Sequence, residues 1–323
     1  MSATTVWGVS ILAALLPTVV YVLILWWLDH YEKEPRGLLL VAFLWGALPA
    51  AVLSIMAEYS LSQPLAALGE SAAGWVSSTV TAPIVEELAK GLAVLLLFIL
   101  AHNEFDDVLD GIVYGATIGF GFAMTENVIY FVRSFQTGGV GMLTMVVILR
   151  AFVFGMNHAL FASVFGAALG YARTLKRGAR RWTFPVLGLL GGMALHSVHN
   201  LFAGLASQVC FSVLLSLASD WGGVLVILVV MWLAWRQEQR WIVVHLRSEV
   251  DNGLLTMDEY HVLGSYGKRM SAWWQALSHS GLAAARRLTR FTQLATELAF
   301  KLEQGDEKRA AKLRGQIAES RQA

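Results

Sequence analysis

The sequence predicts an all-α membrane protein, a polytopic bundle of about seven transmembrane helices followed by a small helical cytoplasmic region at the C-terminal end. Three observations support this fold class. Hydrophobic residues make up 56% of the 323 residues and charged residues only 15%, below the ~25% usual in soluble domains. The mean hydropathy is +0.58. Apolar stretches of about 20 residues, the length that crosses a bilayer, recur along the chain.

The predicted spans follow these apolar stretches in order. They cover residues 6–28, 38–57, 79–101, 111–132, 142–171, 184–205 and 222–235. The fifth stretch is longer than a span needs, and Arg150 within it indicates that the bilayer begins near that residue, with residues 142–149 at the interface. Residues 209–218 are apolar but too short to cross on their own. The first stretch shows no signal-peptide cleavage site, so we expect a retained anchor.

Lysines and arginines gather in alternate loops, which predicts the orientation. Loops on one side hold Lys33, Arg36, Arg173, Lys176, Arg177, Arg180, Arg181, Arg236 and Arg240. The opposite loops hold only Arg133. We therefore expect a multi-pass protein of the cell (inner) membrane, with its N-terminus outside and its C-terminus in the cytoplasm.

From about Glu238 the composition changes to mixed charge with an amphipathic helical pattern. We divide the chain into a transmembrane domain, residues 1–240, and a cytoplasmic helical tail, residues 241–323. The formal net charge of +1 gives no indication of nucleic-acid binding, so the expected surroundings are the lipid bilayer. Cys210 is the only cysteine, which excludes a disulfide framework and a thiolate metal cluster.

The chain is organised around adjacent carboxylates, Glu86 and Glu87, which precede the apolar run of residues 91–100. A charge inside a bilayer is costly, so it usually faces the bundle interior and serves a function. Lys90 follows Glu86 by four residues and Glu87 by three, which brings it within reach of both on a helix. One lysine cannot neutralise two carboxylates. This favours acid–base chemistry over an ion pair that only fixes the depth of the helix.

Further polar residues fall at the same predicted depth in three other spans. They are Glu126, Asn127, His158, His196 and Asn200. At 1.5 Å per residue, all these positions and the glutamate pair lie roughly 10–14 Å below the outer surface. Each residue alone has a structural explanation, such as an asparagine that joins two helices. Their common depth predicts one polar site between four helices.

These residues resemble the PrsW family of intramembrane proteases, which are distant relatives of the CAAX-processing and bacteriocin-immunity membrane proteases. The resemblance rests on Glu86-Glu87-x-x-Lys90, Phe122-x-x-x-Glu126-Asn127, His158, His196-x-x-x-Asn200, Asp110-Gly111-Ile112-Val113-Tyr114-Gly115 and the acidic first loop that ends at Glu34-Pro35. It implies a hydrolase that cleaves membrane-anchored protein substrates near the extracytoplasmic face, including site-1 cleavage of anti-sigma factors. The predicted outer depth of the polar residues agrees with that side.

The resemblance implies a set of catalytic residues. They are Glu86, Glu87, Glu126, His158, His196 and Asn200, with Lys90 and Asn127 in supporting roles. Two other classes of membrane protein are alternatives to a protease. A transporter or ion-binding protein also places acids and histidines inside the membrane, but the sequence shows no inverted repeats. A membrane scaffold would act through the cytoplasmic tail.

The sequence leaves the role of a metal open. Related enzymes are argued to be glutamate-type proteases, in which one of Glu86 and Glu87 would take a proton from the attacking water. His196 and Asn200 would then stabilise the oxyanion. We favour this metal-free reaction because the glutamate pair supplies a base and the Lys90 charge would repel a cation.

Zinc remains the alternative cofactor. Glu126, His158 and His196 form a carboxylate–imidazole set of the kind that binds zinc. In that case the two histidines would be metal ligands instead of hydrogen-bonding groups.

Overall fold

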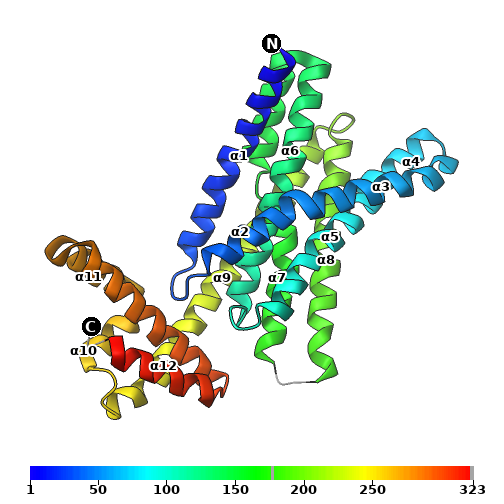
Figure 1. Cartoon of the computed structure of the whole chain (residues 1–323). Helices are drawn as coiled ribbons and strands as arrows, with labels where there is room; N and C mark the ends of the chain where they lie inside the picture. The colour runs from blue at the N-terminus through cyan, green and yellow to red at the C-terminus, as the bar shows by residue number, and fades with distance from the viewer. Residues whose placement is uncertain (176–177, 321–323) are drawn as a thin grey trace. The chain divides into compact units, whose positions relative to one another are not determined.

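A computed structural model of the protein describes residues 1–175 and 178–320 (Figure 1). Every regular element in these residues is a helix, which confirms the predicted all-α fold. The chain divides into two compact units. The first comprises Met1–Trp27 and Glu34–Met231, and the second comprises Leu28–Lys33 and the chain from Trp232 onward. The functional division at residue 240 stays a prediction.

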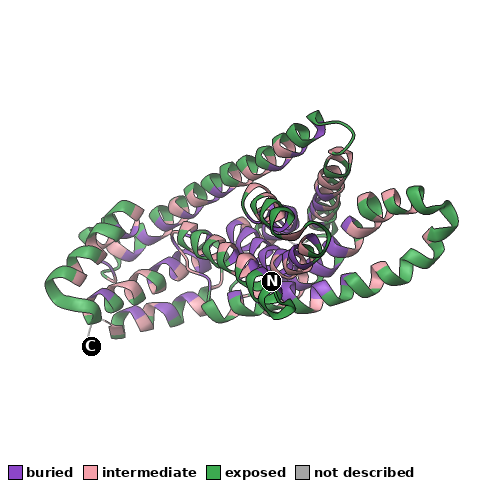
Figure 2. Cartoon of the chain, turned by 90° about the horizontal axis from the view of Figure 1, so that it is seen from above, coloured by how far each residue is buried: buried purple, intermediate pink, exposed green. Residues whose placement is uncertain are grey.

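The first unit contains the long apolar helices. In chain order its elements are α1 (Ala3–Leu28), α2 (Arg36–Trp45), η1 (Gly46–Ala50), α3 (Ala51–Leu65), η2 (Ala66–Leu68), α4 (Glu70–Val76), η3 (Ser77–Thr81), α5 (Ala82–Leu100), α6 (Val108–Val147), η4 (Ile148–Val153), α7 (Asn157–Thr174), η5 (Ala179–Trp182), α8 (Thr183–Leu205) and the first part of α9 (Phe211–Asp251). Figure 2 shows buried residues gathered where these helices meet, with exposed residues on their outward faces. A bundle whose outer faces are apolar suits a lipid environment.

Five helical stretches of the described chain are long and apolar enough to cross a membrane. They are Ala3–Leu28, Arg36–Leu68, Val108–Thr174, Ala179–Leu205 and Phe211–Asp251. The stretch Val108–Thr174 has 67 residues, several times the ~20 of one crossing. Its backbone leaves the helical region at Gly138 and Gly139, where the chain turns back. The exact number of crossings stays a prediction.

The structure adds detail to two segments at the edges of the expected spans. Residues 142–149 belong to the second arm of the helical hairpin that turns at Gly139, where Leu143 packs with Phe131 and Ala151 in one buried cluster. Their position at the membrane interface stays a prediction. Residues 209–218 are too short to cross the membrane alone, but most of them belong to a longer helix. Helix α9 has 41 residues and continues without interruption through Gly222.

Helices α6 and α7 pack with their backbones nearly in contact, because glycines face the neighbouring helix. A Cβ atom on Gly111 would lie 2.0 Å from the carbonyl oxygen of Gly166, and one on Gly119 would lie 2.2 Å from that of His158. Small residues permit this close approach between membrane helices. The packing holds the start of α7, and with it His158, against α6.

The acidic residues before α6 fix the beginning of that helix. The Asp107 carboxylate accepts hydrogen bonds from the backbone amides of Leu109 and Asp110, at 2.7 and 3.3 Å. Asp110 in turn accepts from the Asp107 amide at 2.9 Å, which completes a capping box. Glu34 accepts a hydrogen bond from the Tyr114 hydroxyl. These motif residues therefore have a structural role.

The second unit is a separate helical cluster. It contains the end of α9, α10 (Met257–Leu263), α11 (Tyr266–Glu303) and α12 (Glu307–Ser320). Its Arg269 guanidinium donates to the Leu263 carbonyl at 2.9 Å and to the Thr296 hydroxyl at 2.9 Å. Burial lowers the pKa of Arg269 to about 10. The arginine side chain thus joins α10 to α11 inside the unit.

Candidate active site

Four helices of the first unit bring the predicted acids and histidines together. Helix α5 supplies Glu86, Glu87 and Lys90, α6 supplies Glu126 and Asn127, α7 supplies His158, and α8 supplies His196. All except Glu126 are buried. Two π-helical segments adjoin the site: η3 leads into α5, and η4 carries Arg150 before α7. Such segments are frequent near functional sites because they re-aim side chains.

The Glu87 carboxylate contacts two other buried side chains of the site, Lys90 and His196. Its Oε1 atom lies 2.6 Å from Lys90 Nζ and 2.8 Å from His196 Nδ1. A buried charge is tolerated when it is paired and hydrogen-bonded. The carboxylate therefore compensates the Lys90 charge and fixes the orientation of the His196 ring.

Glu126 holds the second histidine from the opposite side. Its Oε2 atom lies 2.7 Å from His158 Nε2 and 2.6 Å from an Arg150 Nη2. Arg150 Nε also donates to Asn127 Oδ1 at 2.9 Å, and its guanidinium lies 3.8 Å from the centre of the Tyr130 ring. Glu126 is therefore a positioning partner of His158, and Arg150 supplies its counter-charge.

Three acceptor atoms face one small space between these two arms. His158 Nδ1 and His196 Nε2 each lie 3.8 Å from Glu86 Oε2, and that carboxylate oxygen is buried without a hydrogen-bond partner. An ionised carboxylate can only accept hydrogen bonds. The histidine nitrogens that contact carboxylates, His158 Nε2 at Glu126 and His196 Nδ1 at Glu87, therefore carry the protons. The other two nitrogens then present lone pairs.

Lys90 lies at the edge of this space. Its Nζ atom is 3.1 Å from His158 Nδ1 and 3.9 Å from Glu86 Oε2, and 4.5 Å from the centre of the Phe122 ring. An ammonium group can donate three hydrogen bonds. Beside three converging acceptors, the lysine is therefore the donor closest to any reactant bound there.

Asn200 does not join this network in the described residues. Its side-chain amide donates to the Ser78 carbonyl at 2.8 Å, which joins α8 to η3. The predicted role of Asn200 in catalysis stays a prediction that these contacts do not support.

Sequence reasoning missed several polar residues near the site. Arg150 served only as a marker of the bilayer edge, although it pairs with Glu126. Asp220 contacts His199 and Asn157 in a second buried cluster. An acid in an apolar stretch is a signal that could have identified Asp220, but the predicted spans left it in a gap.

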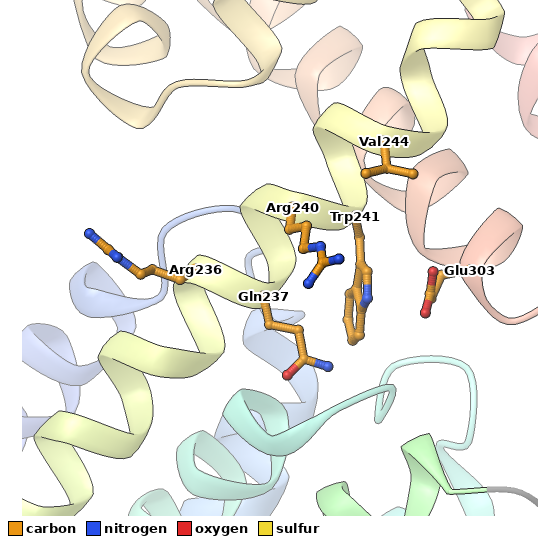
Figure 3. Close-up of a pocket in the computed structure, with 6 residues that line it drawn as sticks. All are labelled: Arg236, Gln237, Arg240, Trp241, Val244 and Glu303. Atoms are coloured by element: carbon orange, nitrogen blue, oxygen red, sulfur yellow. The ribbon is translucent and has the colours of Figure 1, made fainter.

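A pocket in the second unit lies outside this chemistry. It has a volume of about 520 Å³ and is lined by Arg236, Gln237, Arg240, Trp241, Val244 and Glu303. Figure 3 shows Gln237, Arg240 and Trp241 directed toward the space, with Glu303 across from them. The lining has no histidine and no paired carboxylates, so it offers neither a metal set nor an acid–base pair.

The chain is similar to proteins of one known family. The model of the PrsW family intramembrane metalloprotease matches residues 34–235. The chain belongs to the PrsW family. Protease PrsW of Geobacillus kaustophilus (strain HTA426) is 31% identical over 172 residues, 53% of this chain and 69% of the relative. Protease PrsW of Bacillus subtilis (strain 168) is 32% identical over 174 residues, 53% of this chain and 72% of the relative.

Protease PrsW of Oceanobacillus iheyensis is 30% identical over 192 residues, 59% of this chain and 81% of the relative. No solved structure gives a significant match. The PrsW-family chain is therefore a hydrolase, an intramembrane protease, and a multi-pass membrane protein. This confirms the predicted family and decides against the transporter and the scaffold. The matched region contains every residue of the site.

The description of the PrsW family as a metalloprotease implies a metal, and one donor set in the structure fits it. Glu86, His158 and His196 each offer one atom, and all three lie within 4.8 Å of one another. Each histidine places its other ring nitrogen on a carboxylate, the arrangement that usually orients metal-binding imidazoles. The carboxylate in this set is Glu86, whereas Glu126, proposed from the sequence, lies behind His158.

Proposed function

We propose that the chain is an endopeptidase that cleaves membrane-anchored protein substrates near the extracytoplasmic face, as in site-1 cleavage of anti-sigma factors. The observation that carries this proposal is the convergence of His158 Nδ1 and His196 Nε2 on the unpartnered Glu86 Oε2, at 3.8 Å each. All three acceptor atoms lie within 4.8 Å of one another, close enough to contact one small reactant together. The helices that span the membrane are apolar, as expected for an enzyme whose substrates are themselves anchored in the bilayer.

Glu86, His158 and His196 would hold a divalent metal, with zinc as the ion that suits this ligand set. When bound, the metal supplies a more acidic water ligand and polarises the scissile carbonyl. This replaces the metal-free reaction that the sequence favours. The objection from the Lys90 charge weakens, because Glu87 lies 2.6 Å from the lysine and neutralises it.

The remaining residues of the site orient the histidine rings and stabilise the negative charge that develops during attack. Glu87 and Glu126 orient the two imidazole rings by accepting their N–H groups. Glu86 is the carboxylate of the adjacent pair whose Oε2 atom faces both His158 Nδ1 and His196 Nε2, so it is the one placed to contact the attacking water. Lys90 is the donor for the negative oxygen that develops during attack, since both histidine protons are already engaged.

The proposed location is the cell (inner) membrane, with the N-terminus outside and the C-terminus in the cytoplasm. The support is the basic stretch from the last turn of α7 to the start of α8, which holds Arg173, Arg180 and Arg181 in the described chain. Lys176 and Arg177 lie outside the described residues. The division into a transmembrane domain, residues 1–240, and a cytoplasmic tail, residues 241–323, is part of this proposal.

The test uses purified full-length protein in lipid vesicles and a membrane-anchored reporter substrate. Glu86→Gln should reduce cleavage to background, because the substitution removes both charge and ligand. Glu70→Gln, at an exposed position of α4, is the matched control and should cleave normally. Wild-type protein should contain stoichiometric metal, lose activity on chelation and regain it when zinc returns.

Two outcomes would contradict the proposal at different points. Cleavage by Glu86→Gln at the rate of Glu70→Gln would exclude this site. Full activity of metal-free, chelator-treated protein would exclude the metal and restore the metal-free reaction.

A further inference from the structure

A second buried polar cluster lies where α7, α8 and α9 meet. Its centre is Asp220 of α9, whose carboxylate oxygen Oδ2 lies 2.7 Å from His199 Nδ1 of α8. The same oxygen accepts from Asn157 Nδ2 of α7 at 3.1 Å and from Ser216 Oγ at 3.3 Å. One oxygen atom thus joins three helices.

The partners of Asp220 are close neighbours of the two site histidines. Asn157 is the first residue of α7 and directly precedes His158. His199 follows His196 by three residues on α8 and so lies near it on the helix surface. The Phe161 ring stacks on His196 with a centroid distance of 4.8 Å and lies 6.3 Å from His199. A movement of Asn157 therefore shifts the His158 ring, and a movement of His199 shifts the His196 ring. These are the two rings that we assign to hydrolysis.

Packing alone does not account for this cluster. Asp220 is 2% exposed, and burial of a carboxylate among apolar helices is costly. Its other oxygen, Oδ1, has no hydrogen-bond partner in the described structure, so the cost is only partly offset. The face of α9 that meets the bundle here also carries buried Ser212 and Ser216, where apolar side chains would pack at lower cost.

We propose that Asp220 and His199 are positioning residues of the peptidase site. From α9, the carboxylate holds the first turn of α7 through Asn157 and holds α8 through His199. This sets the separation of His158 Nδ1 from His196 Nε2, the two nitrogens that must act on one reactant. The inference rests on the proposed function, which assigns both rings to the hydrolytic site. Displacement of a reacting group by about 1 Å can cost roughly 10²-fold in rate.

The test compares variants of the cluster in the full-length protein. Asp220→Asn and His199→Ala should lower kcat for the membrane-anchored reporter about 10- to 100-fold, the range typical for groups that orient ligands. KM should change by less than about twofold, because no contact with substrate is removed. His199→Gln keeps an amide donor and should retain more activity than His199→Ala.

Ser212→Ala is the matched control. Ser212 lies on the same buried face of α9, two turns before Asp220, and its hydroxyl has no hydrogen-bond partner in the described chain. This variant should keep kcat at the wild-type value. A readout independent of turnover is the rate at which a chelator removes bound zinc, which Asp220→Asn should raise about 10-fold and Ser212→Ala should not.

Unchanged kcat and unchanged zinc release in Asp220→Asn would overturn the inference. A lower unfolding temperature with a normal kcat for each folded molecule would do the same, since it assigns the cluster to stability alone. If Asp220→Asn does not fold, the inference is tested by comparing kcat and zinc release between His199→Gln and His199→Ala. Failure of the proposed function is separate: Glu86→Gln would then still cleave, whereas a kcat loss at Asp220 would continue to support positioning.

Discussion

At the scale of single residues, Arg150 has the least expected role. Its side chain is 25% exposed, and its guanidinium contacts Glu126 at 2.6 Å. Glu126 in turn holds His158 at 2.7 Å. A planar guanidinium binds two acceptors in fixed directions, here Glu126 and Asn127, which a lysine cannot reproduce. Arg150 therefore acts on His158 through Glu126.

We predict that Arg150→Gln lowers kcat about 10- to 100-fold, because Glu126 loses its counter-charge and holds His158 less firmly. The kcat of Arg150→Lys should lie between those of Arg150→Gln and the wild type, since lysine restores the charge without the second hydrogen bond. The measurement is reporter cleavage in vesicles, with the exposed Arg133→Gln as control. Equal kcat for Arg150→Gln and Arg133→Gln would contradict this role.

Much of the site could be predicted from residue type and depth, but its internal arrangement could not. Glu86, Glu87, His158 and His196 do meet between helices. Which glutamate faces both His158 Nδ1 and His196 Nε2 depends on the rotation of α5, since adjacent residues point about 100° apart on a helix. Rotation is decided by tertiary packing, which no local pattern records. For the same reason Asn200 could not be recognised as a partner of the Ser78 carbonyl.

At the scale of elements, the contact between α6 and α7 determines where His158 lies. Gly119 faces the carbonyl group of His158 itself, and a Cβ atom there would lie 2.2 Å from that oxygen. Contact below 3.0 Å with backbone cannot be relieved by a side-chain rotation, so the helices would have to separate. Glycines let membrane helices approach closely, and the structure shows which carbonyl groups they face.

We predict that Gly119→Ala destabilises the first unit by about 1–3 kcal/mol or more and lowers peptidase activity further than stability alone explains. Gly141→Ala is the control in the second arm of α6, because nothing lies within 4 Å of a Cβ there. Thermal unfolding in detergent and kcat for folded protein measure the two effects. A Gly119→Ala protein as stable and active as Gly141→Ala would refute the packing argument.

Element boundaries were the least predictable part of the fold. The sequence separates residues 209–218 from the last span because this apolar stretch is too short to cross a bilayer on its own. In the structure residues 211–218 are the beginning of the continuous helix α9, and Ser212, Ser216 and Asp220 lie buried on one of its faces. The polar residues Ser212, Ser216 and Asp220 thus form an inward-facing stripe of one long helix, which the length of the apolar stretch alone did not reveal.

At the scale of the whole molecule, the orientation in the membrane decides which compartment the site serves. In the proposed orientation, which rests on the basic loops, the connection between α7 and α8 is cytoplasmic and the next connection, between α8 and α9, is outside. Glu86, His158 and His196 would lie nearer that outer side, as cleavage of an extracytoplasmic segment requires.

The single cysteine offers a direct test of this orientation. Cys210 is exposed and lies between α8 and α9, so a membrane-impermeant maleimide should label the unaltered protein in intact cells or spheroplasts. In a Cys210→Ser protein that also carries Gly178→Cys, labelling should appear only after the membrane is opened. Gly178 suits this purpose because nothing lies within 4 Å of a Cβ there. The reverse pattern would place the C-terminus outside and the catalytic residues nearer the cytoplasm, which would exclude site-1 cleavage.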